Sequence, residues 1–200
     1  MLSDPKSSLV KGVARLSKKD ARSQTGLFLL EGPQGLKEAA QSPKSIVELY
    51  ATEDCIARYP EVFETLAKAK VQPMLVTERV LDAMTDTTTP QGVLAVCQQL
   101  DVSLEAVLRT KPKLVAVLSQ VRDPGNAGTV LRAADAAGAD AVVFTDNSVD
   151  IYNPKVVRST TGSLFHLPIV TGIPVLEAIS QLQQAGLQVF AADGGGDLIT

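Results

Sequence analysis

The chain has 200 residues, a formal net charge of −3, 45% hydrophobic residues and no Trp. This length allows one large or two small domains with cores of their own, and no stretch resembles a signal peptide or approaches the roughly 18 uninterrupted apolar residues of a membrane span. The composition therefore predicts a soluble, cytoplasmic protein of the α/β class.

Residues 1–100 alternate between apolar runs and amphipathic runs. The pattern predicts helices and strands in turn: helices at 8–22, 34–41, 58–70 and 78–86, and strands at 26–32, 45–52, 72–77 and 92–98. Such an alternation is typical of a mainly parallel sheet flanked by helices. We expect a first α/β domain over residues 1–100, followed by a linker at 101–113.

A second alternation follows over residues 114–200 and predicts a Rossmann-like parallel sheet. The run 114–121, "LVAVLSQV", is typical of a strand that is covered on both faces. The remaining elements are predicted as the helix 127–138, the strand 140–146, a helix followed by a strand over 154–170, the helix 174–185 and the strand 187–193.

The segment 122–138, "RDPGNAGTVLRAADAAG", places a turn and a helix directly after a predicted strand, where open α/β sheets bind ligands. We expect Asn126 to be the N-cap and Arg132 to reach back past Gly128 toward the strand end. A capped core helix with a surface arginine is the competing interpretation, and spacing alone leaves both open. A dinucleotide site that uses Gly125, Gly128 and Asp146 is a weaker alternative.

Positive charge is concentrated in two stretches of this acidic chain. Residues 6–22 contain Lys6, Lys11, Arg15, Lys18, Lys19 and Arg22 against the single acid Asp20, and residues 151–168 contain Lys155 and Arg158 without any acid. One such stretch is often only a solvated helix face, but two favour contact with a nucleic-acid backbone. No cluster of metal-ligand spacing is present, so we expect no metal, and Cys55 and Cys97 are interpreted as reduced core residues.

Four segments resemble one family. "NAGTVLR" (126–132) is similar to motif 1, Asn-x-Gly-x-x-x-Arg, of the SpoU/TrmH branch of the SPOUT RNA methyltransferases, and three further segments, "SKKDARSQTGLFLLEG" (17–32), "TTTPQGVLAV" (87–96) and "DIYNPKVVRSTTGSLFHLPI" (150–169), match it in order. The resemblance covers almost the whole chain. It implies transfer of a methyl group from S-adenosylmethionine to a ribose 2′-hydroxyl of ribosomal or transfer RNA, by a homodimer with a C-terminal trefoil knot.

The resemblance also implies roles for single residues. Arg132 would be the catalytic arginine, and Asn126 would hold the motif 1 loop in shape. Residues 1–100 would bind the RNA substrate. The candidate RNA contacts are Arg158, Ser159, Lys155, Lys18, Lys19, Arg22 and Glu31.

Motifs 2 and 3, which form the knot and hold the cofactor in this family, should follow the strand 187–193 and are not found before Thr200. We therefore expect an N-terminal part of such an enzyme, with the knot missing or incomplete, the cofactor-binding residues elsewhere and dimerisation in doubt. An RNA-binding module without catalysis is the alternative.

Overall fold

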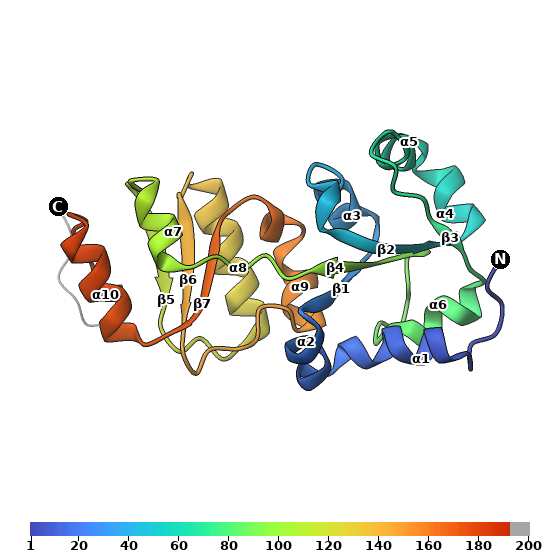
Figure 1. Ribbon diagram of the computed structural model, residues 1–200, viewed down its shortest axis with the longest axis horizontal. Coiled ribbons are helices and arrows are strands. Elements are labelled where there is room, and N and C mark those ends of the chain that lie inside the picture. The colour runs from blue at the N-terminus through green and yellow to red at the C-terminus, as the bar shows by residue number, and fades with distance from the viewer. Residues whose placement is uncertain (193–200) are drawn as a thin grey trace.

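The computed structural model describes residues 1–192, which form two sheets placed side by side along the length of the molecule (Figure 1). The first sheet has the strand order β1-β4-β2-β3, with β1 (Leu27–Glu31), β4 (Val93–Gln98), β2 (Ile46–Ala51) and β3 (Met74–Leu75). Strand β4 runs antiparallel to both of its neighbours, and only β2 and β3 are parallel. The prediction of a mainly parallel first sheet is wrong, because an apolar run that is buried on both faces looks the same in either direction.

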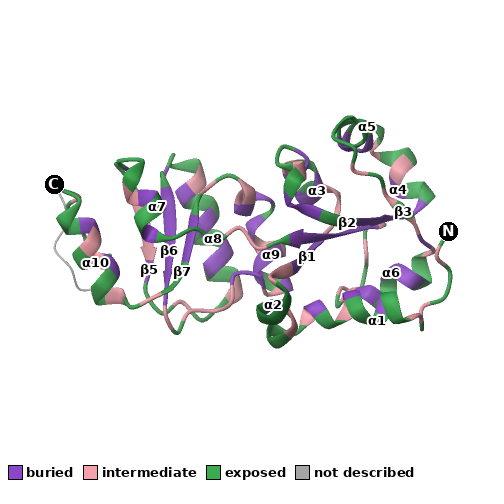
Figure 2. Ribbon diagram, in the orientation of Figure 1, coloured by how far each residue is buried: buried purple, intermediate pink, exposed green. Residues whose placement is uncertain are grey.

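Helices cover both faces of the first sheet. The helices α3 (Pro33–Ala39), α4 (Glu53–Arg58) and α5 (Pro60–Lys68) lie on one side, and α1 (Ser8–Ala14) and α6 (Glu78–Met84) lie on the other (Figure 1). Successive side chains of β1 point to opposite faces of the sheet. Phe28 and Leu30 pack in the hydrophobic cluster that includes α3 and α5, and Leu29 packs in the cluster that includes α1 and α6. The strands are accordingly the most buried parts of the chain (Figure 2).

Two predicted helices are interrupted. The helix expected at 8–22 consists of α1, the 3-10 turn η1 (Arg15–Ser17) and α2 (Lys19–Thr25), because Lys18 is extended. The helix expected at 58–70 is α5 alone, which starts at Pro60 directly after α4. Proline disfavours a helical conformation in the residue before it and suits the first turn of a new helix.

The second sheet is fully parallel, in the order β5-β6-β7, as predicted. It contains β5 (Val115–Leu118), β6 (Ala141–Thr145) and β7 (Ile169–Ile173), and its helices are α7 (Leu104–Arg109), α8 (Pro124–Ala136), α9 (Pro154–Thr160) and α10 (Val175–Gln184). Two 3-10 turns complete the fold, η2 (Pro43–Ser45) and η3 (Ser163–Phe165). Residues 187–192 form no strand, contrary to expectation, and Asp193 lies outside the described residues. The predicted α/β class is confirmed.

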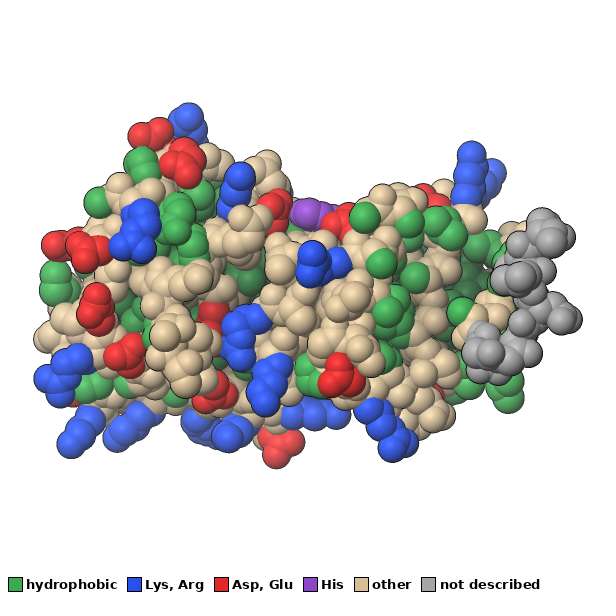
Figure 3. Space-filling view, turned by 180° about the vertical axis from the view of Figure 1, so that it is seen from behind, with side chains coloured by type: hydrophobic (Ala, Val, Ile, Leu, Met, Phe, Trp, Pro, Cys, Tyr) green, Lys and Arg blue, Asp and Glu red, His purple; other side chains and the backbone are tan. Residues whose placement is uncertain are grey.

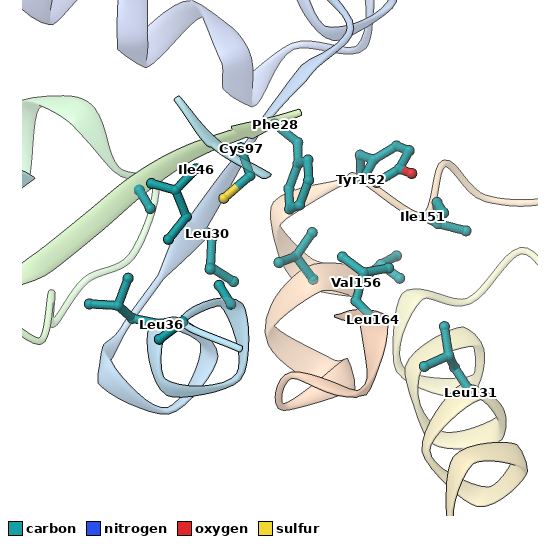
Figure 4. Close-up of a cluster of buried hydrophobic side chains, with 14 of the residues drawn as sticks. Phe28, Leu30, Leu36, Ile46, Cys97, Leu131, Ile151, Tyr152, Val156 and Leu164 are labelled. Atoms are coloured by element: carbon teal, nitrogen blue, oxygen red, sulfur yellow. The ribbon is translucent and has the colours of Figure 1, made fainter. Parts of the chain in front are cut away.

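One hydrophobic cluster joins the two sheets. It includes Phe28 and Leu30 of the first sheet, Val156 of α9 and Leu131 of α8 (Figure 4). At its centre the rings of Phe28 and Tyr152 lie 4.8 Å apart between centroids. The two sheets therefore share a core, while the boundaries 1–100, 101–113 and 114–200 stay a prediction.

Candidate functional site

Helix α8 begins at the carboxyl end of β5, but three residues earlier than predicted. Asp123 is its N-cap and accepts a hydrogen bond of 2.7 Å from the backbone N–H of Asn126. Asn126 therefore lies exposed in the first turn and is not the cap that the sequence analysis predicted. Its role in shaping the motif 1 loop stays a prediction.

Gly128 is the contact point between α8 and α9. A Cβ placed on Gly128 would lie 1.9 Å from Oγ of Ser159 and 2.7 Å from the backbone carbonyl carbon of that residue. The Ser159 hydroxyl also lies 3.0 and 2.7 Å from the carbonyl oxygens of Pro124 and Val156, which share its single hydrogen. The missing side chain of Gly128 thus makes room for α9. The expectation that Gly128 leaves an open path for Arg132 toward the strand end is wrong, because Ser159 fills that space. The structure accounts for Ser159 through helix packing, and its contact with RNA stays a prediction.

Arg132 is exposed on α8, one turn beyond Gly128. Among residues 1–192 its guanidinium takes part in no hydrogen bond or ion pair. A charged group that residues 1–192 leave unpaired is available to another partner. This placement is compatible with the expected contact to a ribose hydroxyl.

Glu31 and Arg158, two predicted RNA contacts 127 positions apart, are brought together between the sheets. An Arg158 guanidinium nitrogen lies 3.1 Å from Oε1 of Glu31, whose side chain is only 8% exposed. Oε2 of Glu31 accepts a hydrogen bond from the hydroxyl of Thr87. Sequence reasoning missed Thr87 as a site residue, although it lies in the segment "TTTPQG" that carried part of the resemblance.

Arg22 does not fit the predicted role of an RNA contact. Its side chain is 2% exposed, its Nε and one terminal nitrogen bind Oδ2 of Asp150 at 3.0 and 2.6 Å, and its other terminal nitrogen donates to the carbonyl oxygen of Leu16. Three nitrogens of the guanidinium are engaged and the side chain is buried, so a phosphate in solution cannot reach it. Arg22 instead ties α2 to the loop before α9.

The other predicted basic contacts are exposed. Lys18 and Lys19 stand near the junction of the two sheets, and Lys155 lies in the first turn of α9. Lys and Arg side chains gather along the lower edge of the molecule, where Figure 1 places α1 and α2 (Figure 3). A row of unburied cations at one edge suits the sugar-phosphate backbone of a nucleic acid.

Asp146 follows β6 and lies in a cavity of about 340 Å³ at the carboxyl ends of β6 and β7. Asp101 and Asp150 line the same cavity, and burial raises the pKa of Asp101 although the Tyr152 hydroxyl bonds to it. Lys19 lines the cavity too, and Asp150 is paired with Arg22. Asp101 and Asp146 still disfavour the phosphates of a dinucleotide, and Gly128 is covered by Ser159. Asp101 and Asp146 also disfavour the carboxylate of S-adenosylmethionine in this cavity. Residues 1–192 hold no group of His, Cys, Asp and Glu side chains placed to bind a metal.

Comparison with known proteins agrees with the sequence resemblance. Residues 113–200 match the SpoU rRNA Methylase family, and residues 7–95 match the MRM3-like substrate binding domain. Within residues 1–192 no helix has the length and apolarity for crossing a membrane.

Two relatives illustrate how much of such proteins the chain spans. It is 36% identical over 186 residues to the 23S rRNA (guanosine(2553)-2′-O)-methyltransferase RlmP of Bacillus subtilis, covering 92% of this chain and 70% of that protein. It is 32% identical over 190 residues to the mitochondrial rRNA methyltransferase 3 of Xenopus laevis, of which it spans 44%.

Solved structures show the same fold. An rRNA methyltransferase from Sinorhizobium meliloti superposes with a TM-score of 0.82 at 27% identity, over 98% of this chain and 74% of that one. The AdoMet-bound rRNA methyltransferase of the same organism gives a TM-score of 0.78 at 27% identity, over 94% and 69%. The family predicted from the sequence is confirmed: the chain belongs to the SpoU family of rRNA methylases.

Proposed function

We propose that the protein acts in S-adenosylmethionine-dependent methylation of a ribose 2′-hydroxyl in structured RNA, with ribosomal RNA as the first candidate and transfer RNA as the second. The observation that carries the proposal is the 36% identity, over 92% of the chain, to a ribosomal RNA 2′-O-methyltransferase. The finer expectations, a cytoplasmic location and a homodimeric full-length enzyme, belong to this proposal. S-adenosylmethionine is the cofactor of the family and supplies the methyl group when bound.

Arg132 is proposed to act on the target hydroxyl. A guanidinium keeps its proton at neutral pH, so it is a poor general base. It can instead hold the 2′-hydroxyl in position and stabilise the alkoxide that develops when the proton leaves. A donor aimed at such an oxyanion contributes on the order of 3 kcal/mol to transition-state stabilisation.

RNA binding is proposed to use the exposed cations at the junction of the two sheets. Lys18, Lys19 and Lys155 are exposed and form no ion pair with any residue of 1–192, unlike Arg22, so each can neutralise a phosphate. Arg158 is engaged with Glu31 but remains 33% exposed, which leaves part of its guanidinium accessible.

The experiment measures transfer of tritiated methyl from S-adenosylmethionine to total RNA by the full gene product. Arg132→Ala should abolish most of the transfer and leave the unfolding midpoint unchanged, because Arg132 is exposed and its guanidinium makes no hydrogen bond or ion pair among residues 1–192. Arg79→Ala is the matched control. Arg79 is also an exposed helical arginine, but it lies on α6, which packs against the first sheet. Unchanged transfer by the Arg132 variant would refute the proposed role.

A second candidate function is an RNA-binding module without catalysis, which the exposed cations favour. It predicts RNA binding that weakens steeply with salt while methyl transfer is undetectable in the full gene product. Methyl transfer that depends on Arg132 would exclude it.

A further inference from the structure

A cavity of about 340 Å³ lies between the two sheets, at the Glu31–Arg158 pair. Its walls come from four places: the end of β1 with the start of α3, the loop 85–91, the start of β4, and the end of α9. Leu30, Val93 and Val157 supply apolar surface, and the polar groups lie among them. Its volume falls within the range of pockets that bind small molecules, which are lined in the same mixed way.

Two polar side chains of the cavity wall place a hydrogen-bond acceptor, Glu31, beside a hydrogen-bond donor, Arg158. Glu31 presents a carboxylate, and Arg158 presents a guanidinium whose one side-chain hydrogen bond among the described residues is the 3.1 Å contact to Glu31. Each carboxylate oxygen of Glu31 has two lone pairs. The Arg158 and Thr87 contacts use one lone pair on each oxygen, so both oxygens can accept again.

We propose that this cavity binds the guanine base of an RNA nucleotide, with Glu31 accepting from N1–H and the 2-amino group and Arg158 donating to O6. Of the four RNA bases, guanine alone presents two adjacent donors and an acceptor on its Watson–Crick edge. Adenine and cytosine present an amino group beside ring acceptors, and uracil presents only one donor. The inference rests on the proposed function, because it assumes that RNA reaches the space between the sheets.

Two further features of the cavity wall fit a binding site. The hydroxyl of Thr85 is buried in the wall and has no hydrogen-bond partner among residues 1–192. Thr161, a β-branched residue, has a φ of 49°, in the left-handed region that such residues rarely adopt. An unpaired hydroxyl and a strained backbone cost stability, and both are typical of sites that a ligand completes.

The ion pair between Glu31 and Arg158 also argues against binding of a phosphate group in this cavity. A phosphate that approached Arg158 would meet the carboxylate of Glu31, which lies 3.1 Å from the guanidinium. Like charges at such a distance repel, whereas a neutral base edge with both donors and an acceptor satisfies both side chains.

The test titrates the 200-residue protein with guanosine, inosine and adenosine 5′-monophosphates and with ribose 5-phosphate. Binding is followed by the amide NMR signals of Gly32 and Gly162, which lie in the cavity wall. Guanosine monophosphate should bind, and inosine monophosphate, which lacks the 2-amino group, should bind about tenfold more weakly because one charge-assisted hydrogen bond is lost. Adenosine monophosphate and ribose 5-phosphate should leave both signals unchanged. This comparison needs no variant and so does not depend on folding of a mutant.

Glu31→Gln should weaken guanosine monophosphate binding by about tenfold or more. Glu64→Gln, which changes an exposed carboxylate on α5, is the matched control and should change nothing. Equal affinity for the guanine and adenine nucleotides, equal affinity for ribose 5-phosphate, or no binding at about 10 mM would each overturn the inference.

Failure of the base site and failure of the proposed function have different signatures. Guanine-selective binding without methyl transfer by the full gene product would support the cavity assignment and refute the enzyme. Arg132-dependent methyl transfer with equal affinity for all four probes would support the enzyme and refute the guanine site.

Discussion

Gly128 and Ser159 lie so close together that α8 and α9 leave no space for a single methyl group between them. The contact holds the helix that carries Arg132 against the helix that carries Arg158. A substitution at this point changes the relative position of both arginines.

Gly128→Ala should therefore destabilise the protein despite the higher helix propensity of alanine. One of the atoms that the new Cβ would meet is a backbone carbon at 2.7 Å, so a side-chain rotation alone does not relieve the clash. Overpacking of this kind costs about 1–3 kcal/mol, measured as the free energy of unfolding in urea.

The control for this prediction is Gly12→Ala in α1. A Cβ on Gly12 meets nothing within 4 Å, so only the helix propensity changes, and the substitution should stabilise by up to about 1 kcal/mol. Equal effects of the two substitutions would show that the α8–α9 contact is looser than the structure has it.

The Arg22–Asp150 pair should be a main stabiliser of the junction between the sheets. Arg22→Met leaves the Asp150 carboxylate, whose side chain is 17% exposed, without its cationic partner. Breaking a buried pair from one side costs about 3–5 kcal/mol in the free energy of unfolding. Lys19→Met, which removes an exposed charge from the same helix, should change stability little.

The double variant Arg22→Met with Asp150→Asn measures the interaction energy between the two side chains apart from their contacts with other residues. It should recover part of the loss, because no uncompensated charge remains in the junction. Additive losses in the double variant would mean that the two side chains act independently.

His166 should make the stability depend on pH near neutrality. Its Nδ1 lies 2.7 Å from Oδ2 of Asp135 on α8, and its Nε2 lies 3.2 Å from Oε2 of Glu38 on α3. Both partners are acceptors, so only the doubly protonated ring can donate to both. The Asp135 hydrogen bond raises the pKa of His166, burial opposes it, and the Glu38 hydrogen bond adds to the rise.

The sign of the effect follows from this raised pKa. The stabilisation is fully present below the unfolded pKa of about 6.5 and is lost as the pH rises through the folded value. Urea unfolding should therefore give a lower stability at mildly alkaline than at mildly acidic pH. His166→Gln should remove this difference, and a difference of the same size in the variant would assign it to other groups.

Local patterns in the sequence predicted the three strands of the second sheet and the helices between them. The family resemblance named Glu31, Arg132 and Arg158 as site residues, and these roles stay a prediction. They could not give the direction of β4, since its burial on both faces erases the alternation that marks an exposed face. The N-cap was assigned to Asn126 because Pro124 and Gly125 were read as a turn. Proline is also favoured in the first turn of a helix, and here Asp123 caps it.

Arg22 shows the other limit of such reasoning. Its neighbours in sequence are cations and polar residues, so it was predicted to bind RNA with them. Its partner Asp150 is 128 positions away, and only the tertiary fold shows that Arg22 faces inward. The same holds for Glu38 and His166, which no local pattern connects.

Lys18 and Lys19 should contribute to RNA affinity through phosphate contacts, since both are exposed at the start of α2. Replacing both by Gln should reduce the magnitude of the slope of log affinity against log salt by about 1.5, because each phosphate contact releases about 0.7–0.9 of a counterion. The measurement is a salt titration of binding to a structured ribosomal RNA fragment.

The matched control replaces Lys44 and Lys68 by Gln, which removes the same total charge. These lysines are also exposed, and Lys68 lies on α5, on the opposite face of the first sheet from α1 (Figure 1). The control should leave the salt slope unchanged because only net charge differs. Equal slopes for the two double variants would show that RNA responds to net charge alone and does not contact the edge formed by α1 and α2.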